Sequence, residues 1–348
     1  MNKLNFCAGP AKLPEKVYQK LSQMVLNYED SGVSLLSLSH RDPLFLGVYQ
    51  RIIKQMRKLL HLSDDFEILL MPGGATLQFS AVALNLKQKG KAGYFNSGYW
   101  AKKAIDEAAR FIDVACFLPD ERISEQDQAQ FDYVHYTDNE TIDGFCWRKM
   151  PCVEVPLLCD MSSSFLSKPL DMTRFSLIYA GAQKNIGLPG TGLVIMRKSL
   201  LKKDKPAVPQ LLDYDQMAHA NSLYNTPNVI GWVTIELVLE HLIEQGGLSQ
   251  VARLNAEKAA LLYQYIDSSS LFYNKVAKPN RSDMNVVFQL VDEKLTDKFL
   301  AYAKAQDLYG LKGHRSLGGC RASLYNAVTL EEVKALIEVM KEFEKHAG

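Results

Sequence analysis

Residues 175–187 read Phe-Ser-Leu-Ile-Tyr-Ala-Gly-Ala-Gln-Lys-Asn-Ile-Gly, an apolar run that leads into a lysine flanked by glycines. The run predicts a buried strand that delivers Lys184 into the turn at its end. An amine attacks an aldehyde only when it is partly neutral, and desolvation at a strand end lowers its pKa toward that condition. Lys184 is therefore a candidate Schiff-base residue, although a lysine that stands alone is more often a solvated surface charge.

A second apolar run, at residues 155–159, ends in Asp160 and is followed by the hydroxyls of Ser162 and Ser163. In a doubly wound α/β domain the parallel strands end along one edge of the sheet, so we expect Asp160 and Lys184 to face one crevice. Pyridoxal phosphate needs both groups, because a fixed aspartate keeps its ring nitrogen protonated. Standing alone, Asp160 is more typical of a helix cap or a turn.

Longer motifs around these residues resemble the signatures of the phosphoserine aminotransferases, which are class-V aminotransferases of fold type I. The resemblance begins at residue 6, reaches the last predicted helix and leaves no large segment unexplained. The motifs are Phe6-Cys-Ala-Gly-Pro-Ala11, Ser39-His-Arg41, His135-Tyr-Thr-Asp-Asn-Glu-Thr-Ile-Asp-Gly144, Gly181-Ala-Gln-Lys-Asn-Ile-Gly187, Gly313-His-Arg315 and Gly319-Cys-Arg-Ala-Ser-Leu-Tyr-Asn-Ala327.

The resemblance implies an α/β protein of the fold-type I PLP-dependent transferases. Such a protein has a large domain with a mostly parallel seven-stranded sheet and a smaller α+β C-terminal domain. We expect the large, cofactor-binding domain at residues 15–245 and the small domain at residues 246–348 together with residues 1–14. The resemblance also implies a homodimer with shared active sites.

For the reaction, the resemblance implies interconversion of 3-phosphohydroxypyruvate plus glutamate and O-phosphoserine plus 2-oxoglutarate in L-serine biosynthesis. Lys184 would hold pyridoxal 5′-phosphate as an internal aldimine and then move a proton between substrate and cofactor. Both acids would use one site in turn, so we expect ping-pong kinetics. The sequence leaves open whether 4-phosphohydroxy-L-threonine, of pyridoxine biosynthesis, is a second substrate.

The cofactor phosphate needs several hydrogen-bond donors, and the first N–H groups of a helix supply them. Gly73-Gly74 lies between a predicted strand and a predicted helix, which suits such a site, although a lone pair of glycines usually marks a turn. Trp100 would stack on the cofactor ring, with ordinary core packing as the alternative. The resemblance assigns to the cofactor Ala75, Thr76, Trp100, Thr141, Asp160, Ser162, Gln183 and Lys184, together with Asn225 and Thr226 of the partner subunit.

Arginine suits a substrate with an anionic group at each end, because its planar fork makes paired, charge-assisted hydrogen bonds. The resemblance assigns Arg321 to the α-carboxylate. It assigns His40, Arg41, His314 and Arg315 to the distal phosphate or to the side-chain carboxylate of glutamate. His-Arg pairs by themselves are usually surface charge. Some relatives carry an arginine where this chain has Thr76, so one anionic contact of those relatives is absent here.

Composition agrees with a two-domain enzyme. The chain has 348 residues, a hydrophobic content of 47%, a formal net charge of +1 and a pI near 7.6. This length exceeds one small core, so one large and one smaller domain are expected. The near-neutral charge argues against nucleic acid or a membrane surface as a partner. No apolar run approaches the roughly 18 residues of a membrane span.

The six cysteines have neither CxxC spacing nor the density of a disulfide-stapled secreted domain. We therefore expect reduced thiols and no metal site. The first residues lack an apolar core of signal-peptide length, so we expect a cytoplasmic protein.

Strand-like and helical patterns alternate up to about residue 245, which predicts a mostly parallel sheet. Beyond that point long helices dominate, after a break at Gly246-Gly247, and Thr329-Leu-Glu-Glu332 is a capping box before a final amphipathic helix. The predicted strands are residues 66–71, 93–96, 114–117, 133–136, 157–160, 177–180, 190–196 (a candidate antiparallel strand) and 284–290. Predicted helices include residues 99–110 and a helix with Pro14 in its first turn.

Two other classes of function deserve comparison with the transaminase. A lyase or desulfurase of the same fold needs a catalytic cysteine or a different carboxylate partner. Cys7, Cys152 and Cys159 have no evident activating base nearby in the sequence. A non-catalytic protein that binds phosphate ligands would be expected to lose Lys184 or Asp160. The chain keeps both residues.

Overall fold

The computed structural model describes residues 3–201 and 207–347, and its largest element is a seven-stranded sheet with the order β2-β8-β7-β6-β5-β3-β4. Strand β8 is antiparallel to both of its neighbours, and the other neighbouring pairs are parallel, as the sequence predicted. The strands are β2 (Phe66–Gly73), β3 (Lys91–Phe95), β4 (Asp113–Phe117), β5 (Val134–Thr137), β6 (Leu157–Asp160), β7 (Leu177–Gly181) and β8 (Gly190–Arg197).

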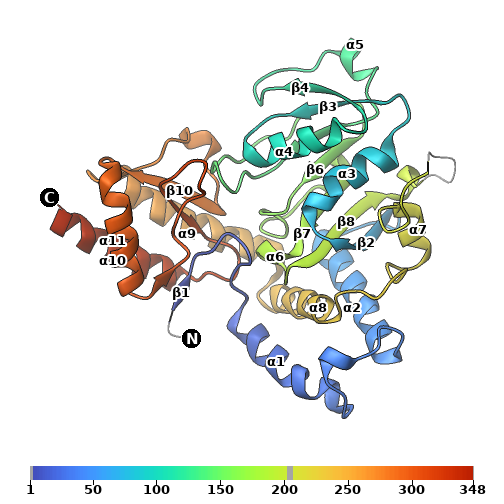
Figure 1. Cartoon of the computed structure of the whole chain (residues 1–348), viewed down its shortest axis with the longest axis horizontal. Helices are drawn as coiled ribbons and strands as arrows, with labels where there is room; N and C mark the ends of the chain where they lie inside the picture. Colours follow the sequence, from blue (N-terminus) through green and yellow to red (C-terminus); the bar gives the residue numbers. More distant parts are fainter. Residues whose placement is uncertain (1–2, 202–206, 348) are drawn as a thin grey trace.

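Helices cover both faces of this sheet (Figure 1). One face packs against α2 (Pro43–Leu60) and α8 (Val229–Glu244), with α1 (Glu15–Leu26) packed on α8. The other face packs against α3 (Ala75–Leu86), α4 (Tyr99–Ala108) and α7 (Tyr214–His219). Successive strand residues point to opposite faces, so Ile68 joins the first core and Leu69 the second. Burial on both faces explains why the strands are almost continuously apolar.

The C-terminal part of the chain builds a smaller α+β unit with its own core. Phe6, from the start of the chain, belongs to this core. The N-terminal β1 (Leu4–Asn5) pairs in parallel with β11 (Leu308–Tyr309), so both described ends of the chain lie in the smaller unit (Figure 1). Its sheet has the order β12-β10-β9, formed by β9 (Phe272–Tyr273), β10 (Asn285–Leu290) and β12 (Cys320–Ser323), and its helices are α9 (Gly247–Ser268), α10 (Thr296–Ala305) and α11 (Leu330–Ala347).

Local signals in the sequence explain where several helices begin and end. Gly246 and Gly247 separate α8 from α9 with φ angles of 91° and 75°, a region that favours glycine. The predicted capping box forms at the start of α11, because the Thr329 amide donates to Glu332 and the Glu332 amide donates to the Thr329 hydroxyl. Pro14 immediately precedes α1 and does not enter its first turn.

The six strands other than β8 share one direction, and this direction positions the site. The carboxyl ends of β2, β3, β5, β6 and β7 lie along one edge of the sheet, and the segments that follow carry most of the predicted site residues. Two short helices complete the large unit, α5 (Glu125–Gln128) and α6 (Ala182–Asn185). In the described ranges, no helix is long and apolar enough to cross a membrane. The six cysteines are free thiols.

Candidate active site

Lys184 lies in α6, directly beyond the carboxyl end of the fully buried strand β7. Its Nζ donates a hydrogen bond of 2.7 Å to the Thr141 hydroxyl. Burial lowers the pKa of the Lys184 amine to about 8, while the negative charges of Asp160 and Glu140 oppose this shift. A substantial fraction of this amine is therefore neutral near physiological pH, which is the form that reacts with an aldehyde.

Asp160 ends β6, the strand beside β7, and is 4% exposed. One of its carboxylate oxygens accepts hydrogen bonds from the Ser162 amide (2.8 Å) and the Ser162 hydroxyl (2.6 Å). The same hydroxyl accepts from the Gly181 amide, just before α6. Burial raises the pKa of Asp160, and the positive charge of Lys184 works in the opposite direction. Ser162 thus fixes the Asp160 carboxylate relative to the strand that carries Lys184.

Trp100 and Thr141 come from the segments that follow β3 and β5. The Lys184 Nζ lies 5.3 Å from the centre of the Trp100 ring, which stands in the first turn of α4. The indole Nε1 is buried and has no hydrogen-bond partner among the described residues. An aromatic face, a hydroxyl and a partly neutral amine therefore meet at the sheet edge.

Arg321 reaches this place from β12 of the smaller unit. Its Nη1 donates to the Thr141 carbonyl at 3.4 Å, and its buried Nε has no partner in the described structure. Burial lowers the pKa of this guanidinium. A half-buried arginine with an unpaired N–H group is suited to bind an anion placed next to Lys184.

The two predicted His-Arg pairs occupy different places. The His314 ring lies 5.1 Å from the ring of Tyr99, the neighbour of Trp100, and Arg315 beside it is exposed. His40 and Arg41 precede α2. The Arg41 amide donates to the Ser39 hydroxyl, and no hydrogen bond or ion pair within the described residues joins His40 or Arg41 to the other site residues.

The predicted phosphate cradle lies where β2 turns into α3. Gly73 and Gly74 have φ angles of 90° and 150°, a region that favours glycine, and Gly74 supplies no side-chain cap to the helix. The first amide groups of α3, at Ala75 and Thr76, are therefore available to an anion. Gln183 lies beside Lys184 in α6, and its carbonyl accepts from the Ala11 amide.

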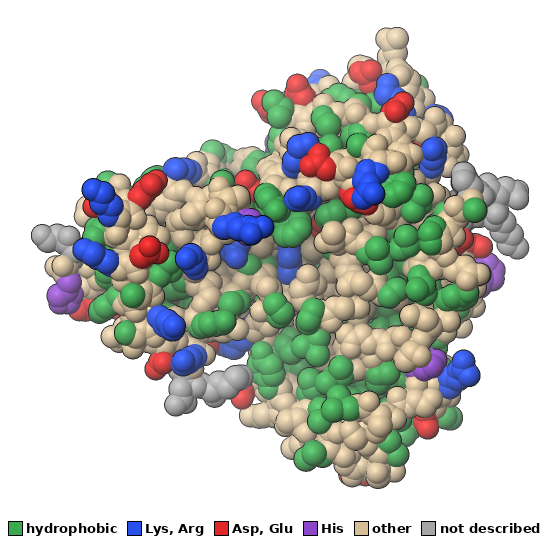
Figure 2. Space-filling model, in the orientation of Figure 1, with side chains coloured by type: hydrophobic (Ala, Val, Ile, Leu, Met, Phe, Trp, Pro, Cys, Tyr) green, Lys and Arg blue, Asp and Glu red, His purple; other side chains and the backbone are tan. Residues whose placement is uncertain are grey.

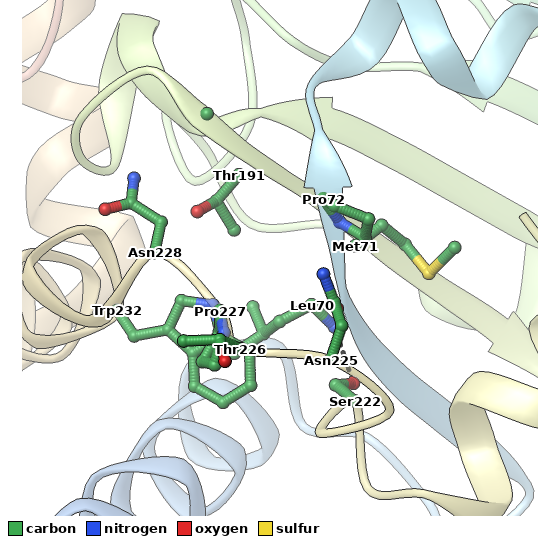
Figure 3. Close-up of a pocket in the computed structure, with 11 residues that line it drawn as sticks. Leu70, Met71, Pro72, Thr191, Ser222, Asn225, Thr226, Pro227, Asn228 and Trp232 are labelled. Atoms are coloured by element: carbon green, nitrogen blue, oxygen red, sulfur yellow. Dashed lines mark hydrogen bonds between the residues drawn. The ribbon is translucent and has the colours of Figure 1, made fainter. Parts of the chain in front are cut away.

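Asn225 and Thr226 line a separate cavity of about 220 Å³ between β2, the start of β8 and the loop before α8 (Figure 3). Thr191 contributes a buried hydroxyl without a partner among the described residues. No hydrogen bond in the described chain joins Asn225 or Thr226 to Lys184 or Asp160. Neither Lys184 nor Asp160 lines this cavity.

Sequence reasoning did not predict the part played by Tyr325. Its hydroxyl donates to the Ala8 carbonyl at 2.9 Å and accepts from the side-chain Nδ2 of Asn285 at 3.3 Å. The same hydroxyl hydrogen-bonds to Thr141. The available signal was a polar side chain inside the motif at residues 319–327. Tyr325 connects the smaller unit to the residue that binds Lys184.

A sheet edge with such an amine, carboxylate and aromatic ring is typical of enzymes that use an aldehyde cofactor. The family model described as "Aminotransferase class-V" matches residues 3–336, and the chain belongs to this family. Among curated proteins, it is 46% identical to the phosphoserine aminotransferase of Acinetobacter baumannii, with 100% of both chains covered. It is 44% identical to that of Pseudomonas syringae pv. tomato, with 99% of this chain and 98% of the relative covered.

Solved structures agree with this assignment. The phosphoserine aminotransferase from Bacillus circulans subsp. alkalophilus superposes with a TM-score of 0.94 at 37% identity, covering 99% of this chain and 98% of that one. The PLP-bound phosphoserine aminotransferase from Trichomonas vaginalis superposes with a TM-score of 0.92 at 35% identity, covering 97% and 99%. The fold is that of the fold-type I aminotransferases, as predicted.

The protein is therefore a pyridoxal-phosphate-dependent aminotransferase, and its residues fit the cofactor. A partly neutral amine, a buried carboxylate and an aromatic ring face one another, and free amide groups open α3 on the same edge of the sheet. Pyridoxal phosphate supplies an aldehyde that condenses with amines and a ring that accepts electrons from the substrate.

Proposed function

We propose that this enzyme transfers the amino group between O-phosphoserine and 2-oxoglutarate, the phosphoserine transaminase reaction of L-serine biosynthesis. The observation that carries the proposal is the meeting of Lys184, Asp160 and Trp100 with Arg321, in a chain 46% identical to a phosphoserine aminotransferase. Amino acids and keto acids are accordingly its small-molecule substrates, with glutamate and 3-phosphohydroxypyruvate on the other side of the reaction.

We propose the following parts for the cofactor residues. Lys184 would bind the aldehyde and then move a proton at the α-carbon of the substrate, which its lowered pKa favours. Asp160, held by Ser162, would pair with the ring nitrogen, and Thr141 would hydrogen-bond near the ring oxygen. Trp100 would stack on the ring. The amides of Ala75 and Thr76, assisted by Gln183 and Ser162, would hold the phosphate.

Substrate recognition would divide between two groups of cations. Arg321 would bind the α-carboxylate, because one of its nitrogens donates to the carbonyl of Thr141, the residue that binds Lys184, and its buried Nε has no partner among the described residues. His314 and Arg315 would bind the distal phosphate together with His40 and Arg41 of the partner subunit. The position of His314 against Tyr99 supports this division.

A homodimer with shared sites would supply the residues that stand apart in one chain. The segment that holds His40 and Arg41 also exposes large apolar side chains, including Leu26 at 80% and Leu36 at 66%. Figure 2 shows hydrophobic side chains gathered on the lower part of one face, over α1 and α8. Such a patch is typical of a protein interface. Across an interface at this patch, Asn225 and Thr226 of the partner subunit would also bind the cofactor phosphate.

We further propose the division into domains at residues 15–245 and at 246–348 with 1–14. Phe6 lies in the smaller core, which supports placing the start of the chain in the small domain. Leu13, Leu248 and Val251 lie next to the two proposed boundaries and pack into the larger core. A cytoplasmic location and activity toward 4-phosphohydroxy-L-threonine stay predictions.

A lyase or desulfurase function has less support. Such an enzyme needs a reactive thiolate, and burial instead raises the pKa of the thiols of Cys7, Cys146, Cys159 and Cys320. Retention of Lys184 with a lowered pKa speaks against a protein that only binds phosphate ligands.

The experiment that tests the substrate compares half-reaction kcat/KM for O-phosphoserine, glutamate and alanine. Arg315→Ala should weaken the two substrates with an anionic side chain, O-phosphoserine and glutamate, far more than alanine, which has no distal anion. Arg321→Ala should weaken all three alike. Losing a charge-assisted contact that the bound substrate buries costs about 2–5 kcal/mol, or roughly 30- to several-thousand-fold in kcat/KM. Equal losses for all substrates in Arg315→Ala would reject the distal site, and a wild-type enzyme that ignores O-phosphoserine would reject the function.

A further inference from the structure

Glu140 is a buried carboxylate to which the reaction described above gives no part. It precedes Thr141, the residue that binds Lys184, and it is 0% exposed. Buried carboxylates are rare unless their oxygens are satisfied by hydrogen bonds. The donors that satisfy Glu140 all come from the segment that carries Trp100.

Those donors are the start of α4. The Trp100 amide donates to one Glu140 oxygen at 2.8 Å, and the Ala101 amide donates to the other at 2.9 Å. The Ser97 hydroxyl also donates to Glu140, at 3.2 Å. Gly98, at the cap position, offers no side chain, so Glu140 satisfies amide groups that the helix itself leaves free. A negative charge at this end is also favoured by the helix dipole.

The fit around Glu140 is tight. A Cβ on Gly98 would lie 2.8 Å from the Glu140 Cδ and 2.7 Å from a carboxylate oxygen of Asp143, which accepts from the Tyr99 amide. The glycine therefore leaves room for the carboxylate to reach the helix. Any larger residue at position 98 must push Glu140 away from the Trp100 amide.

Glu140 also acts on the amine through space. The charged groups that face Lys184 are Asp160 of β6, Glu140 of the segment after β5 and Arg321 of β12. Glu140 favours the charged ammonium form, so it helps to set the fraction of neutral amine. Burial raises the pKa of Glu140 itself to about 7, with smaller contributions from Asp143 and Asp160.

We propose that Glu140 is a positioning residue of the transaminase site: its side chain fixes the first turn of α4 and thereby holds the Trp100 indole against Lys184. This inference rests on the proposed function, because Trp100 and Lys184 are the groups that would bracket the cofactor ring. Two oxygens are needed for this part, since three donors converge on the carboxylate. Glutamine has a single acceptor oxygen and no charge.

The test compares Glu140→Gln with a matched control, Asp132→Asn. Asp132 is a buried carboxylate that accepts from the amides of Gln88, Lys89 and Gly90 at the opposite end of β3. Both variants should lose stability to denaturant, because each removes a buried charge that binds several donors. A purely structural role for Glu140 predicts that the two variants otherwise behave alike.

Three readouts separate a positioning role from a structural one. In cofactor-free protein, competitive acetylation at Lys184, read by mass spectrometry at pH 8, should rise by up to about twofold in Glu140→Gln, because about half of an amine with a pKa of about 8 is already neutral there. It should stay unchanged in Asp132→Asn. The induced circular dichroism of added pyridoxal phosphate should weaken in Glu140→Gln alone, because it reports ring orientation. The kcat of Glu140→Gln should fall about tenfold, while its KM for O-phosphoserine stays within about twofold of the wild-type value.

Identical labelling and dichroism in the two variants would overturn the proposal. If Glu140→Gln does not fold, Gly98→Ala takes its place, because it displaces the carboxylate and keeps its charge. Wild-type dichroism in Gly98→Ala would likewise overturn it. Labelling and dichroism do not depend on the substrate, so an enzyme that ignores O-phosphoserine would refute the proposed function and leave the test of Glu140 intact.

Discussion

The reactivity of Lys184 arises from its surroundings. The apolar strand that precedes it buries the amine, and burial disfavours the ammonium form, while Asp160 and Glu140 limit the shift. The sequence predicted the position of Lys184 at a strand end, because an apolar run followed by glycine is a local signal. It did not predict the hydrogen bond to Thr141, which joins residues far apart in the chain.

Replacing Lys184 with alanine should abolish transamination and leave the fold intact. The change removes both the amine that binds the aldehyde and the proton carrier, so kcat should fall by about four orders of magnitude or more. The cofactor should still bind without a covalent bond, which reduction with borohydride followed by mass spectrometry will show. Turnover near the wild-type rate in Lys184→Ala would remove Lys184 from the reaction.

The lowered pKa of Lys184 also predicts how stability depends on pH in the cofactor-free protein. Between pH 8 and pH 10.5 the folded chain binds fewer protons at Lys184 than the unfolded chain, so its contribution to the free energy of unfolding rises with pH. Urea unfolding of wild type and Lys184→Met at pH 7.5 and pH 9.5 isolates this effect, because the other buried lysine, Lys258, is common to both. The wild type should gain about 1–3 kcal/mol more than the variant. Equal gains would show that the Lys184 amine is not desolvated.

At the scale of elements, strands and helices were more predictable than the contacts between them. The strands at 157–160 and 177–181 and the break at Gly246 follow from patterns that local residues carry. The hydrogen bonds of Tyr325 and Glu140 depend on how segments pair across the sheet and between the two units. The residue pattern of a single segment does not encode such pairings, so these hydrogen bonds could be identified only from the structure.

The capping box of α11 offers a test of one local signal. Thr329→Ala removes the hydroxyl that accepts from the Glu332 amide, and the free energy of unfolding should fall by about 0.5–2 kcal/mol. Activity should not change, because Thr329 lies outside the proposed site. Serine at this position should restore most of the stability. A Thr329→Ala enzyme as stable as wild type would show that the box adds nothing to α11.

At the scale of the whole molecule, one chain leaves the proposed site incomplete. His40, Arg41, Asn225 and Thr226 make no hydrogen bond to the residues around Lys184 within the described chain. Sequence motifs identified these residues, and the proposed homodimer would bring them to the site from a second subunit. The exposed apolar side chains near Arg41 support that proposal.

Mixing two inactive variants tests the shared site. Lys184→Ala and Arg41→Ala subunits, co-expressed with different tags, should form mixed dimers in which one site has both Lys184 and Arg41. Random assembly should then recover about a quarter of wild-type activity, well above either variant alone. If Arg41 acts within its own chain, the mixture will show only the average of the two parents.

One measurement tests the central claim most directly, namely that this chain is a phosphoserine transaminase that uses bound pyridoxal phosphate at Lys184. Purified wild-type protein loaded with the cofactor is titrated with O-phosphoserine and then with 2-oxoglutarate while its visible absorbance is followed. The account predicts that O-phosphoserine bleaches the cofactor band and that 2-oxoglutarate restores it, with glutamate formed in equal amount. A band that O-phosphoserine leaves unchanged, while glutamate or another amino acid bleaches it, would contradict the claim.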